Sequence, residues 1–216
     1  AASLEAAGRP AGHIHVTGNP AFDNIHDPAV IAQGQALRRE AGWSTQRVVF
    51  YASSPEPDEV TGIAGRGDPA WPRRIETQLI ETVQRDPALA LWVRRHPSEA
   101  PADEIEAAGH PRIRVAKGPL HPYLHACDEV VVTVSTVGVE ANLAGREVTQ
   151  VRGSTLDGLS PYLAMGVAQR ELTLDEVTGQ LAQPVATPAR AADGAPGQAA
   201  ARVLAVAQRV AHAGAA

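Results

Sequence analysis

The sequence is poor in cysteine and in aromatic residues, and each shortage excludes a class of protein. Its 216 residues include one cysteine, Cys127, so the chain forms no internal disulfide, and a reducing compartment such as the cytoplasm is favoured. Aromatic residues make up 4% of the chain, which indicates a core of Val, Leu, Ile and Ala, with Cys127 as a small apolar filler. A chain of this length can bury a full core without disulfides.

Lysine is also scarce, and negative charges outnumber positive ones. Lys117 is the only lysine, and the formal net charge is −5 at pH 7. A protein that binds nucleic acid needs a basic surface, so we expect no nucleic-acid partner. No apolar run reaches the ~20 residues of a membrane-spanning helix, and no signal peptide is visible. We therefore expect a cytoplasmic protein with no transmembrane segment.

Common nucleotide and metal motifs are missing as well. Neither G-x-G-x-x-G nor G-x-x-x-x-G-K-[ST] occurs, so a dinucleotide fingerprint and a P-loop are not supported. His121 and His125 stand four residues apart on an expected helix and could grip a metal together, but no third ligand is evident. We expect these two side chains to pack or to face solvent, and we expect no metal site.

Short apolar runs alternate with amphipathic segments along most of the sequence. The runs rich in β-branched residues predict buried strands, and apolar residues at helical spacing predict helices. The expected strands are 47–52, 89–93, 113–116, 129–134 and 147–151, with a weaker one at 169–174; the expected helices are 27–39, 73–84, 102–108, 119–126, 137–144, 175–181 and 198–213. This alternation predicts a Rossmann-like α/β domain with a doubly wound parallel sheet.

Three local patterns give further expectations. HIHVT, at residues 13–17, alternates polar and apolar side chains and predicts a short strand. Asp175 stands at the start of a helical pattern and is expected to cap that helix. The segment 187–197 is rich in Pro, Gly and Ala, which predicts a linker between a domain at 1–186 and a C-terminal helix at 198–216.

Polar residues follow the expected strands at the point where each strand ends. Ligands of an open parallel sheet bind beyond the carboxyl ends of its strands, where the strand order reverses. The candidate site residues are Ser53 and Ser54 after the first strand, His96 after the second, Lys117 after the third, Ser135 and Thr136 after the fourth, and Arg152 after the fifth.

The segment 129–145 carries the clearest site pattern. Its strand leads to Ser135, a good N-cap residue, and the following helix ends at Gly145, a good C′ residue. The free N–H groups and the positive dipole end of such a helix attract phosphate. Thr136 and Glu140 share a helix face, so the carboxylate could reach a sugar hydroxyl pair beside the phosphate. A plainer interpretation is that Ser135 only caps the helix and Glu140 only complements its dipole.

Four segments together resemble the C-terminal, donor-binding half of GT-B-fold glycosyltransferases of bacterial polysaccharide synthesis. They are VTGNPAFD at 16–23, RVVFYASSPEP at 47–57, LWVRRHP at 91–97 and HACDEVVVTVSTVGVEANLAGREVTQV at 125–151. Their order and spacing match the family along most of the chain. The resemblance implies that the chain forms one half of a GT-B fold, and that an N-terminal acceptor domain lies elsewhere.

The resemblance also implies roles for the candidate residues. Ser135 and Thr136 would bind the donor phosphates, Glu140 the ribose hydroxyls, and Ser53 or Ser54 would line the phosphate loop. His96 would be the catalytic residue, near the phosphates, stabilising the leaving nucleotide. Lys117, with residues 115–116, would contact the base, and Arg152 a phosphate or an acidic group of the sugar.

The same resemblance defines the expected partners. They are a nucleotide sugar and a glycan or lipid-linked acceptor, with no metal or other cofactor. A lipid-linked acceptor would bring the enzyme only peripherally to the inner face of the membrane. The His-Pro element favours a CMP-linked donor, and a UDP-linked donor stays open.

Two other functions fit this fold. UDP-N-acetylglucosamine 2-epimerases share it, but they usually carry Ser-Gly-Gly with paired Glu, followed by an Arg-x-x-Thr-Glu-x-x-Glu run. Here the two sites read STVGVE at 135–140 and RGSTLDGL at 152–159, so the Arg and Thr are kept but the carboxylates do not align. The other alternative is a non-catalytic nucleotide-binding module.

Overall fold

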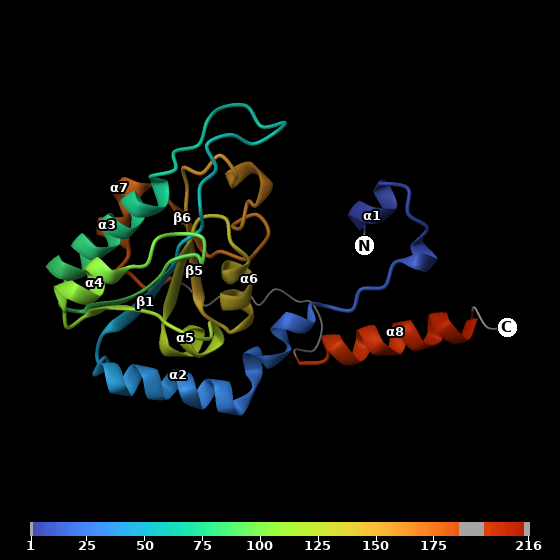
Figure 1. Cartoon of the computed structure of the whole chain (residues 1–216), viewed down its shortest axis with the longest axis horizontal. Coiled ribbons are helices and arrows are strands. Elements are labelled where there is room, and N and C mark those ends of the chain that lie inside the picture. The colour runs from blue at the N-terminus through green and yellow to red at the C-terminus, as the bar shows by residue number, and fades with distance from the viewer. Residues whose placement is uncertain (1, 186–196, 214–216) are drawn as a thin grey trace. The chain divides into compact units, whose positions relative to one another are not determined.

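The structure is a computed structural model that describes residues 2–185 and 197–213 (Figure 1). The chain divides into two compact units. The larger unit, Ala29–Ala191, holds the sheet, and the smaller unit combines Ala1–Pro28 with Ala192–Ala216. The predicted linker at 187–197 lies almost entirely outside the described residues, so the predicted boundaries at 186 and 198 stay predictions.

Six parallel strands form the sheet of the larger unit, in the order β3-β2-β1-β4-β5-β6. They are β1 (Arg47–Ala52), β2 (Leu89–Arg94), β3 (Ile113–Val115), β4 (Glu129–Val132), β5 (Glu147–Val151) and β6 (Arg170–Leu172). The predicted Rossmann-like parallel sheet is confirmed. The strand order reverses between β1 and β4, so the carboxyl ends of these two strands mark the point where ligands of such sheets bind.

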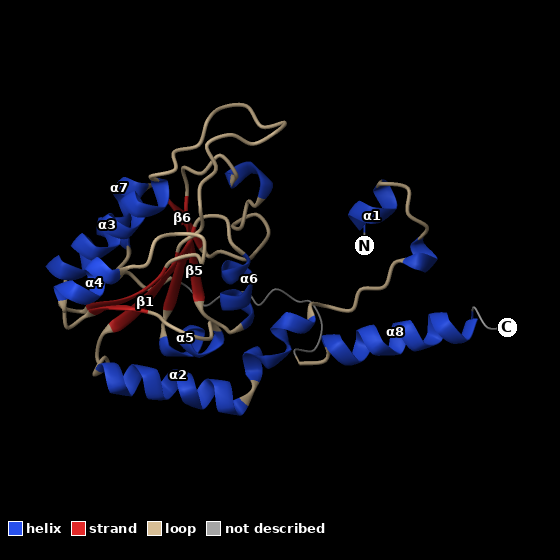
Figure 2. Ribbon diagram, in the orientation of Figure 1, coloured by secondary structure: helices blue, strands red, loops and turns tan. Residues whose placement is uncertain are grey.

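Helices cover both faces of this sheet (Figure 2). One face carries α3 (Trp71–Arg85), α4 (Asp103–Ala108) and α7 (Leu174–Gln180), and the other carries α5 (His121–Ala126) and α6 (Thr136–Leu143). The helix α2 (Pro28–Ala41) packs against α5. Gly34 permits this close packing, because a Cβ atom there would lie 2.4 Å from the carbonyl oxygen of Pro122.

The central strands are buried on both faces, which explains why their sequences are unbroken apolar runs. On one face, Val49 and Tyr51 belong to the same buried cluster as the apolar stripe of α3. This stripe consists of Ile75, Leu79 and Val83, which are fully buried and recur every four residues.

Four aromatic residues lie together on the α5 face of the sheet. Trp92 of β2 lies between Trp43 and Tyr123, with ring centroids 4.7 and 5.1 Å away, and Tyr123 stacks on Phe50 at 5.9 Å. Cys127 is fully buried, as expected for a small apolar filler. The α5 face of the core therefore contains an aromatic group, whereas the α3 face is mostly aliphatic and includes Tyr51 and Trp71.

Buried charges stabilise the amino-terminal ends of the strands, opposite the carboxyl ends where ligands of such sheets bind. Glu129, the first residue of β4, is fully buried. Its carboxylate accepts hydrogen bonds from Arg47 at 2.9 Å and from Arg170 and Thr149 at 2.5 Å each. A buried carboxylate must be paired and hydrogen-bonded to offset its desolvation, so we interpret the cluster as structural.

Two local predictions are wrong. Residues 13–17 form no strand: a 3-10 turn covers Ala11–His13 and irregular chain follows. Val16 is 73% exposed, so the alternating pattern buries no side chain that could stabilise a strand. Asp175 does not cap α7; Thr173 does, in a capping box with Glu176, because that pair satisfies N–H groups at both ends of the box.

The smaller unit consists of α1 (Ala2–Ala6), two 3-10 helices (Ala11–His13 and Pro20–His26) and α8 (Ala199–Ala213). Asp23 caps α8, since its carboxylate accepts the N–H groups of Ala199 and Ala200 at 2.9 Å each. These two bonds lower the pKa of Asp23.

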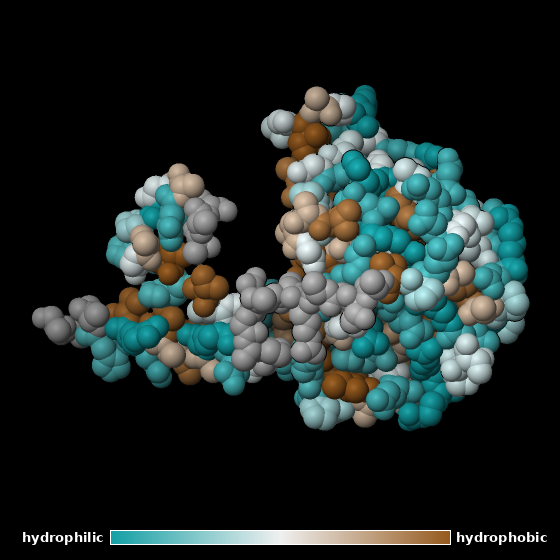
Figure 3. Space-filling view, turned by 180° about the vertical axis from the view of Figure 1, so that it is seen from behind, coloured by the Kyte–Doolittle hydropathy of each residue, from teal (hydrophilic) through white to brown (hydrophobic). Residues whose placement is uncertain are grey.

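The surface is largely hydrophilic, with apolar residues scattered over it, when seen from the side opposite to Figure 1 (Figure 3). Three of the exposed large apolar side chains, Leu159, Leu163 and Met165, belong to the segment between β5 and β6. Within residues 2–185 and 197–213, no helix is both long enough and apolar enough to cross a membrane.

Candidate functional site

The loop after β1 joins the ends of three other strands. We call residues 53–56 the central loop. The N–H of Ser53 donates to the carbonyl of Arg94 at the end of β2, at 2.8 Å. The hydroxyl of Ser54 donates to the carbonyl of Val134 after β4, at 3.1 Å. The central loop therefore bridges the ends of β2 and β4, which flank β1 at the reversal point.

Glu56 extends the central loop to the end of β5. Its carboxylate is buried, with the residue 7% exposed. It accepts hydrogen bonds from the hydroxyl of Ser154 at 2.6 Å and from both the N–H and the hydroxyl of Thr155 at 2.7 Å. These bonds fix the segment that follows Arg152. Sequence reasoning missed Glu56, because its partners lie about a hundred residues further along the chain.

Glu99 brings Ser53 and His96 together. One of its oxygens accepts from the Ser53 hydroxyl at 3.0 Å and from Arg73 at 2.6 Å, and the other accepts from the N–H of His96 at 2.7 Å. Burial opposes ionisation of Glu99, but the three donors outweigh it, so its pKa is lower than usual. Glu99 was not predicted, although its place three residues after His96 was visible.

The imidazole of His96 is exposed and has one nitrogen bound within its own turn. Its Nδ1 accepts the N–H of Ser98 at 3.2 Å and lies 2.7 Å from the hydroxyl of the same residue. In the neutral ring the proton is then on Nε2. No hydrogen bond among the described residues uses Nε2 of His96, so this nitrogen can donate to an anion beyond the strand ends.

The start of α6 has the predicted N-cap residue, Ser135, and a tyrosine hydroxyl bonds to the backbone of the same residue. The Ser135 hydroxyl accepts the N–H of Val137 at 3.3 Å, which confirms Ser135 as the N-cap. The hydroxyl of Tyr162 donates to the carbonyl of Ser135 at 2.6 Å and accepts its N–H at 3.0 Å. The Tyr162 ring covers Gly138, where a Cβ atom would lie 2.9 Å from the ring. Tyr162 gave no signal in the sequence.

Thr136 and Glu140 lie on α6 as expected but differ in exposure. Thr136, the first residue of the helix, is exposed, and its hydroxyl makes no hydrogen bond within the described part of the chain. The Glu140 side chain is 13% exposed, and its Oε2 lies 2.9 Å from Nε2 of His121 on α5. Of the two, only Thr136 offers an unoccupied polar group to an anion at the helix start.

Lys117 and Arg152 lie further from the central loop. Lys117 follows β3, the outer strand, and its ammonium is 68% exposed and 2.6 Å from Glu106. This contact raises its pKa. Arg152 follows β5; its side chain is 59% exposed and 3.6 Å from Glu171. The structure shows no contact that joins either side chain to Ser135 or His96.

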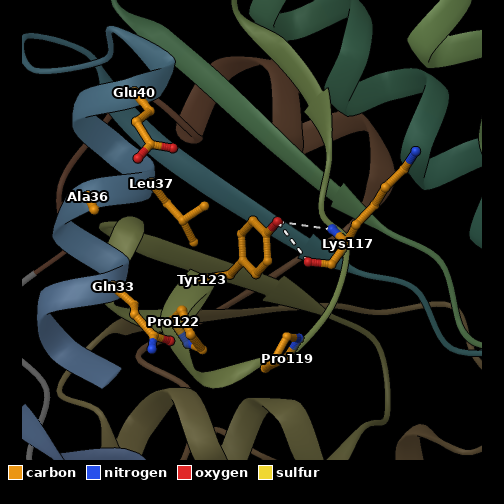
Figure 4. Close-up of a pocket in the computed structure, with 8 residues that line it drawn as sticks. All are labelled: Gln33, Ala36, Leu37, Glu40, Lys117, Pro119, Pro122 and Tyr123. Atoms are coloured by element: carbon orange, nitrogen blue, oxygen red, sulfur yellow. Dashed lines mark hydrogen bonds between the residues drawn. The ribbon is translucent and has the colours of Figure 1, made fainter. Parts of the chain in front are cut away.

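A cleft of about 280 Å³ separates α2 from the β3–α5 segment (Figure 4). Pro119, Pro122 and Tyr123 line it, and the Tyr123 hydroxyl bonds both the N–H and the carbonyl of Lys117 at 3.0 Å. Lys117 contributes its backbone, and its ammonium points away from the other residues drawn. The lining is mostly apolar, and Gln33 and Glu40 of α2 contribute polar side chains to it.

A second cleft, of about 380 Å³, lies at the carboxyl ends of β5 and β6. Arg152, Gln150, Asp157 and Glu171 line it together with small and apolar residues. Asp157 accepts the N–H of Gly153 at 2.7 Å, and its other oxygen is buried without a partner among the described residues. Burial raises the pKa of Asp157. The polar lining is suited to hydroxyl groups of a ligand.

The described residues contain no group of three or more His, Cys, Asp or Glu side chains arranged to hold a metal ion. His121 contacts Glu140 rather than forming a pair with His125. At the strand ends the carboxylates of Glu56 and Glu99 are bonded within the protein, whereas the Thr136 hydroxyl and Nε2 of His96 have no hydrogen bond among the described residues. Such groups bind phosphate and hydroxyl oxygens.

Solved structures with this fold include several enzymes of nucleotide sugars. A UDP-GlcNAc 2-epimerase from Neisseria meningitidis bound to UDP-GlcNAc is 12% identical, with a TM-score of 0.64 over 96% of this chain and 58% of that chain. The enzyme of the same name from Methanocaldococcus jannaschii, in complex with UDP-GlcNAc and UDP, is 11% identical, with a TM-score of 0.60 over 96% and 58%. Anabaena HepE, in complex with UDP and glucose, is 18% identical, with a TM-score of 0.51 over 98% and 60%.

These likenesses show the fold, an α/β Rossmann-like domain. This chain spans less than two thirds of the length of those structures. No protein-family model matches the sequence, and no curated protein matches it either.

Proposed function

We propose that this chain binds a nucleoside diphosphate sugar at the reversal point between β1 and β4, as the donor-binding domain of a GT-B glycosyltransferase. The observation that carries the proposal is the central loop, which links the ends of β2, β4 and β5 beside the start of α6. Such a loop keeps the binding groups in place before the ligand arrives. The fold adds support, because similar structures hold UDP or UDP-GlcNAc.

The diphosphate would lie against the N-terminus of α6. The hydroxyl of Thr136 and the helix N–H groups would donate to it, and Nε2 of His96 would donate as charge develops on the leaving nucleotide. The hydroxyls of Ser53 and Ser54 already bond within the protein, so we assign them to shaping the loop. Glu140 would accept the ribose hydroxyls, and Arg152 would contact the sugar or a phosphate.

The proposed donor nucleotide is UDP in preference to CMP. The His-Pro element favours CMP, but three similar structures with TM-scores of 0.51 to 0.64 carry UDP or UDP-GlcNAc. The proposed acceptor is a glycan or a lipid-linked glycan, held by a separate acceptor domain in a cytoplasmic or peripheral enzyme. The imidazole and the N–H donors would replace a metal ion at the phosphates, so binding should not need a divalent cation.

A second candidate is a UDP-N-acetylglucosamine 2-epimerase, which the names of two similar structures favour. Against it, the α6 segment carries one carboxylate, Glu140, preceded by Val139. The Asp157 carboxylate near Arg152 is used in a turn, where it accepts the N–H of Gly153. The third hypothesis is a non-catalytic nucleotide-binding module, which would bind a nucleotide without turning over a nucleotide sugar.

Calorimetric titration of the chain with UDP, CDP, CMP and GDP, with and without EDTA, tests the proposal. We expect UDP to bind without added metal. Ser135→Ala should weaken binding about fivefold, because loss of an N-cap costs about 1 kcal/mol and loosens the helix start against which the diphosphate lies. Thr173→Ala is the matched control, since it removes the cap of α7 and leaves α6 intact. A folded chain that binds none of these nucleotides would refute the proposal.

Turnover by the natural full-length protein separates the two enzyme classes. Inversion at C2 of the sugar breaks the C2–H bond, so an epimerase acting on UDP-GlcNAc in D2O would leave deuterium at C2. A transferase would instead release UDP only when an acceptor or water takes the sugar. Proton NMR of the reaction mixture distinguishes these products.

A further inference from the structure

A histidine from the neighbouring helix holds the Glu140 carboxylate. Nε2 of His121 lies 2.9 Å from Oε2 of Glu140. The two side chains are 19% and 13% exposed, so the contact is largely shielded from water. His121 is the first residue of α5, and Glu140 lies one turn after the start of α6. The pair therefore joins the starts of two helices on the same face of the sheet.

His121 is the hydrogen-bond donor in this contact. An ionised carboxylate only accepts hydrogen bonds, so Nε2 must be the donor, whether the imidazole is neutral or protonated. Only Oε2 is used by His121. No hydrogen bond among the described residues uses Oε1, so this oxygen and the remaining lone pairs can accept from another group. A ribose presents two adjacent hydroxyl donors of the required kind.

The contact also changes the entropy of binding. A glutamate side chain has several rotatable bonds, and a free one loses rotamer freedom when it binds a ligand. A donor that fixes the carboxylate beforehand removes this loss from the binding step. Glu140 faces solvent at only 13% of its side chain, so its direction is set within the protein rather than by the ligand.

We propose that His121 is the positioning residue of the ribose site: it fixes Glu140 so that the domain distinguishes ribonucleotides from deoxyribonucleotides. This inference rests on the proposed function, because it needs a nucleotide whose ribose reaches Glu140. His121 itself does not contact the ligand. Its effect should therefore be confined to the part of the affinity that depends on the ribose hydroxyls.

Calorimetric titration with UDP and 2′-deoxy-UDP measures that part directly. The wild-type chain should bind UDP about tenfold more tightly than 2′-deoxy-UDP, the size of one hydrogen bond to a charged group. In His121→Ala the affinity for UDP should fall more than that for 2′-deoxy-UDP, which keeps only the 3′-hydroxyl, so the ratio of the two affinities should approach one. His121→Gln, which keeps an N–H donor, should restore most of the preference.

Two further variants complete the comparison. Glu140→Gln should also lose the preference, since an amide accepts from hydroxyls less strongly than a carboxylate. His125→Ala is the matched control: His125 lies one turn along α5 with its Cβ against Gly34 of α2. This substitution should keep the wild-type ratio of the two affinities.

Each result has a distinct meaning. Equal weakening of both ligands by His121→Ala would show a purely structural contact and would overturn the inference, as would an unchanged ratio. If the wild-type chain binds UDP and 2′-deoxy-UDP equally, Glu140 does not serve the ribose, and the inference is also wrong while nucleotide binding stands. If the folded wild-type chain binds no UDP, the proposed function itself fails.

Discussion

Removal of the Tyr162 hydroxyl should loosen the start of α6 and leave the core in place. The hydroxyl bonds both backbone groups of Ser135, at 2.6 and 3.0 Å, and Tyr162 is 4% exposed. Phenylalanine keeps the ring that covers Gly138, so Tyr162→Phe changes the hydrogen bonds alone. The substitution leaves the half-buried N–H of Ser135 without a partner, whereas the Ser135 carbonyl keeps the N–H of Gly138 at 3.0 Å.

The magnitude follows from the two lost bonds. Each contributes about 1 kcal/mol net, and a buried group left unpaired adds to the loss, so we expect about 2–3 kcal/mol in the free energy of unfolding. For a chain of this size, each kcal/mol lowers the melting temperature by about 2–4 °C. Thermal unfolding followed by circular dichroism should show a decrease of about 4–12 °C. The UDP affinity should fall as well, because Ser135 begins the proposed phosphate site.

Tyr51→Phe provides the control for this experiment. The Tyr51 hydroxyl is also buried and donates to the carbonyl of Pro72 at 2.9 Å, at the α3 face and away from α6. Its loss should lower the melting temperature but not the UDP affinity. A shift of the melting temperature by less than about 2 °C in Tyr162→Phe would contradict this prediction. So would UDP binding that Tyr162→Phe weakens no more than Tyr51→Phe does.

Other substitutions test the rest of the site. Glu56→Ala removes the acceptor of three hydrogen bonds and should lower the free energy of unfolding by about 3 kcal/mol in urea; a loss below about 0.5 kcal/mol contradicts the bridging role. The pKa of Glu99 is lowered below 4.5 in the folded state, so its ionised form stabilises the fold above pH 4.5, and this stabilisation disappears as the pH falls through the folded pKa. Glu99→Gln should reduce the dependence of the melting temperature on pH in this acid range. An unchanged pH dependence would contradict the stabilising role of ionised Glu99. Gly138→Ala places a methyl group 2.9 Å from the Tyr162 ring and should cost about 1–3 kcal/mol, whereas a neutral result would mean that the ring moves freely. Burial raises the pKa of Cys127 to about 12, so thiol reagents should label it only in denaturant; rapid labelling at pH 8 without denaturant would be the opposite result.

Much of the fold could be predicted because it depends on local chemistry. Strands buried on both faces must be apolar runs, and Ser135 caps α6 because its hydroxyl satisfies an N–H two residues away. The same locality explains the errors. HIHVT has an alternating pattern, but a strand also needs a partner and a buried face, which the pattern does not supply. The pattern predicts Asp175 as a cap, although the stronger pair, Thr173 and Glu176, stands beside it.

The candidate site could be predicted only in part. The sequence identified the residues that follow strands, because every strand end is visible in the alternation. It did not identify the residues that hold them, since Glu56 and Thr155 are separated by 99 positions and Tyr162 and Ser135 by 27. No periodic pattern links residues so far apart.

The sequence by itself therefore determined the class of fold and the set of polar groups at the strand ends. Only the tertiary structure decided which of them act together. It sets β1 between β2 and β4, so the central loop can bond to both neighbours, and it leaves Lys117 at the end of β3 in contact with Glu106 instead. The physical reason is that strand composition fixes burial, whereas the order of strands in the sheet fixes which ends meet.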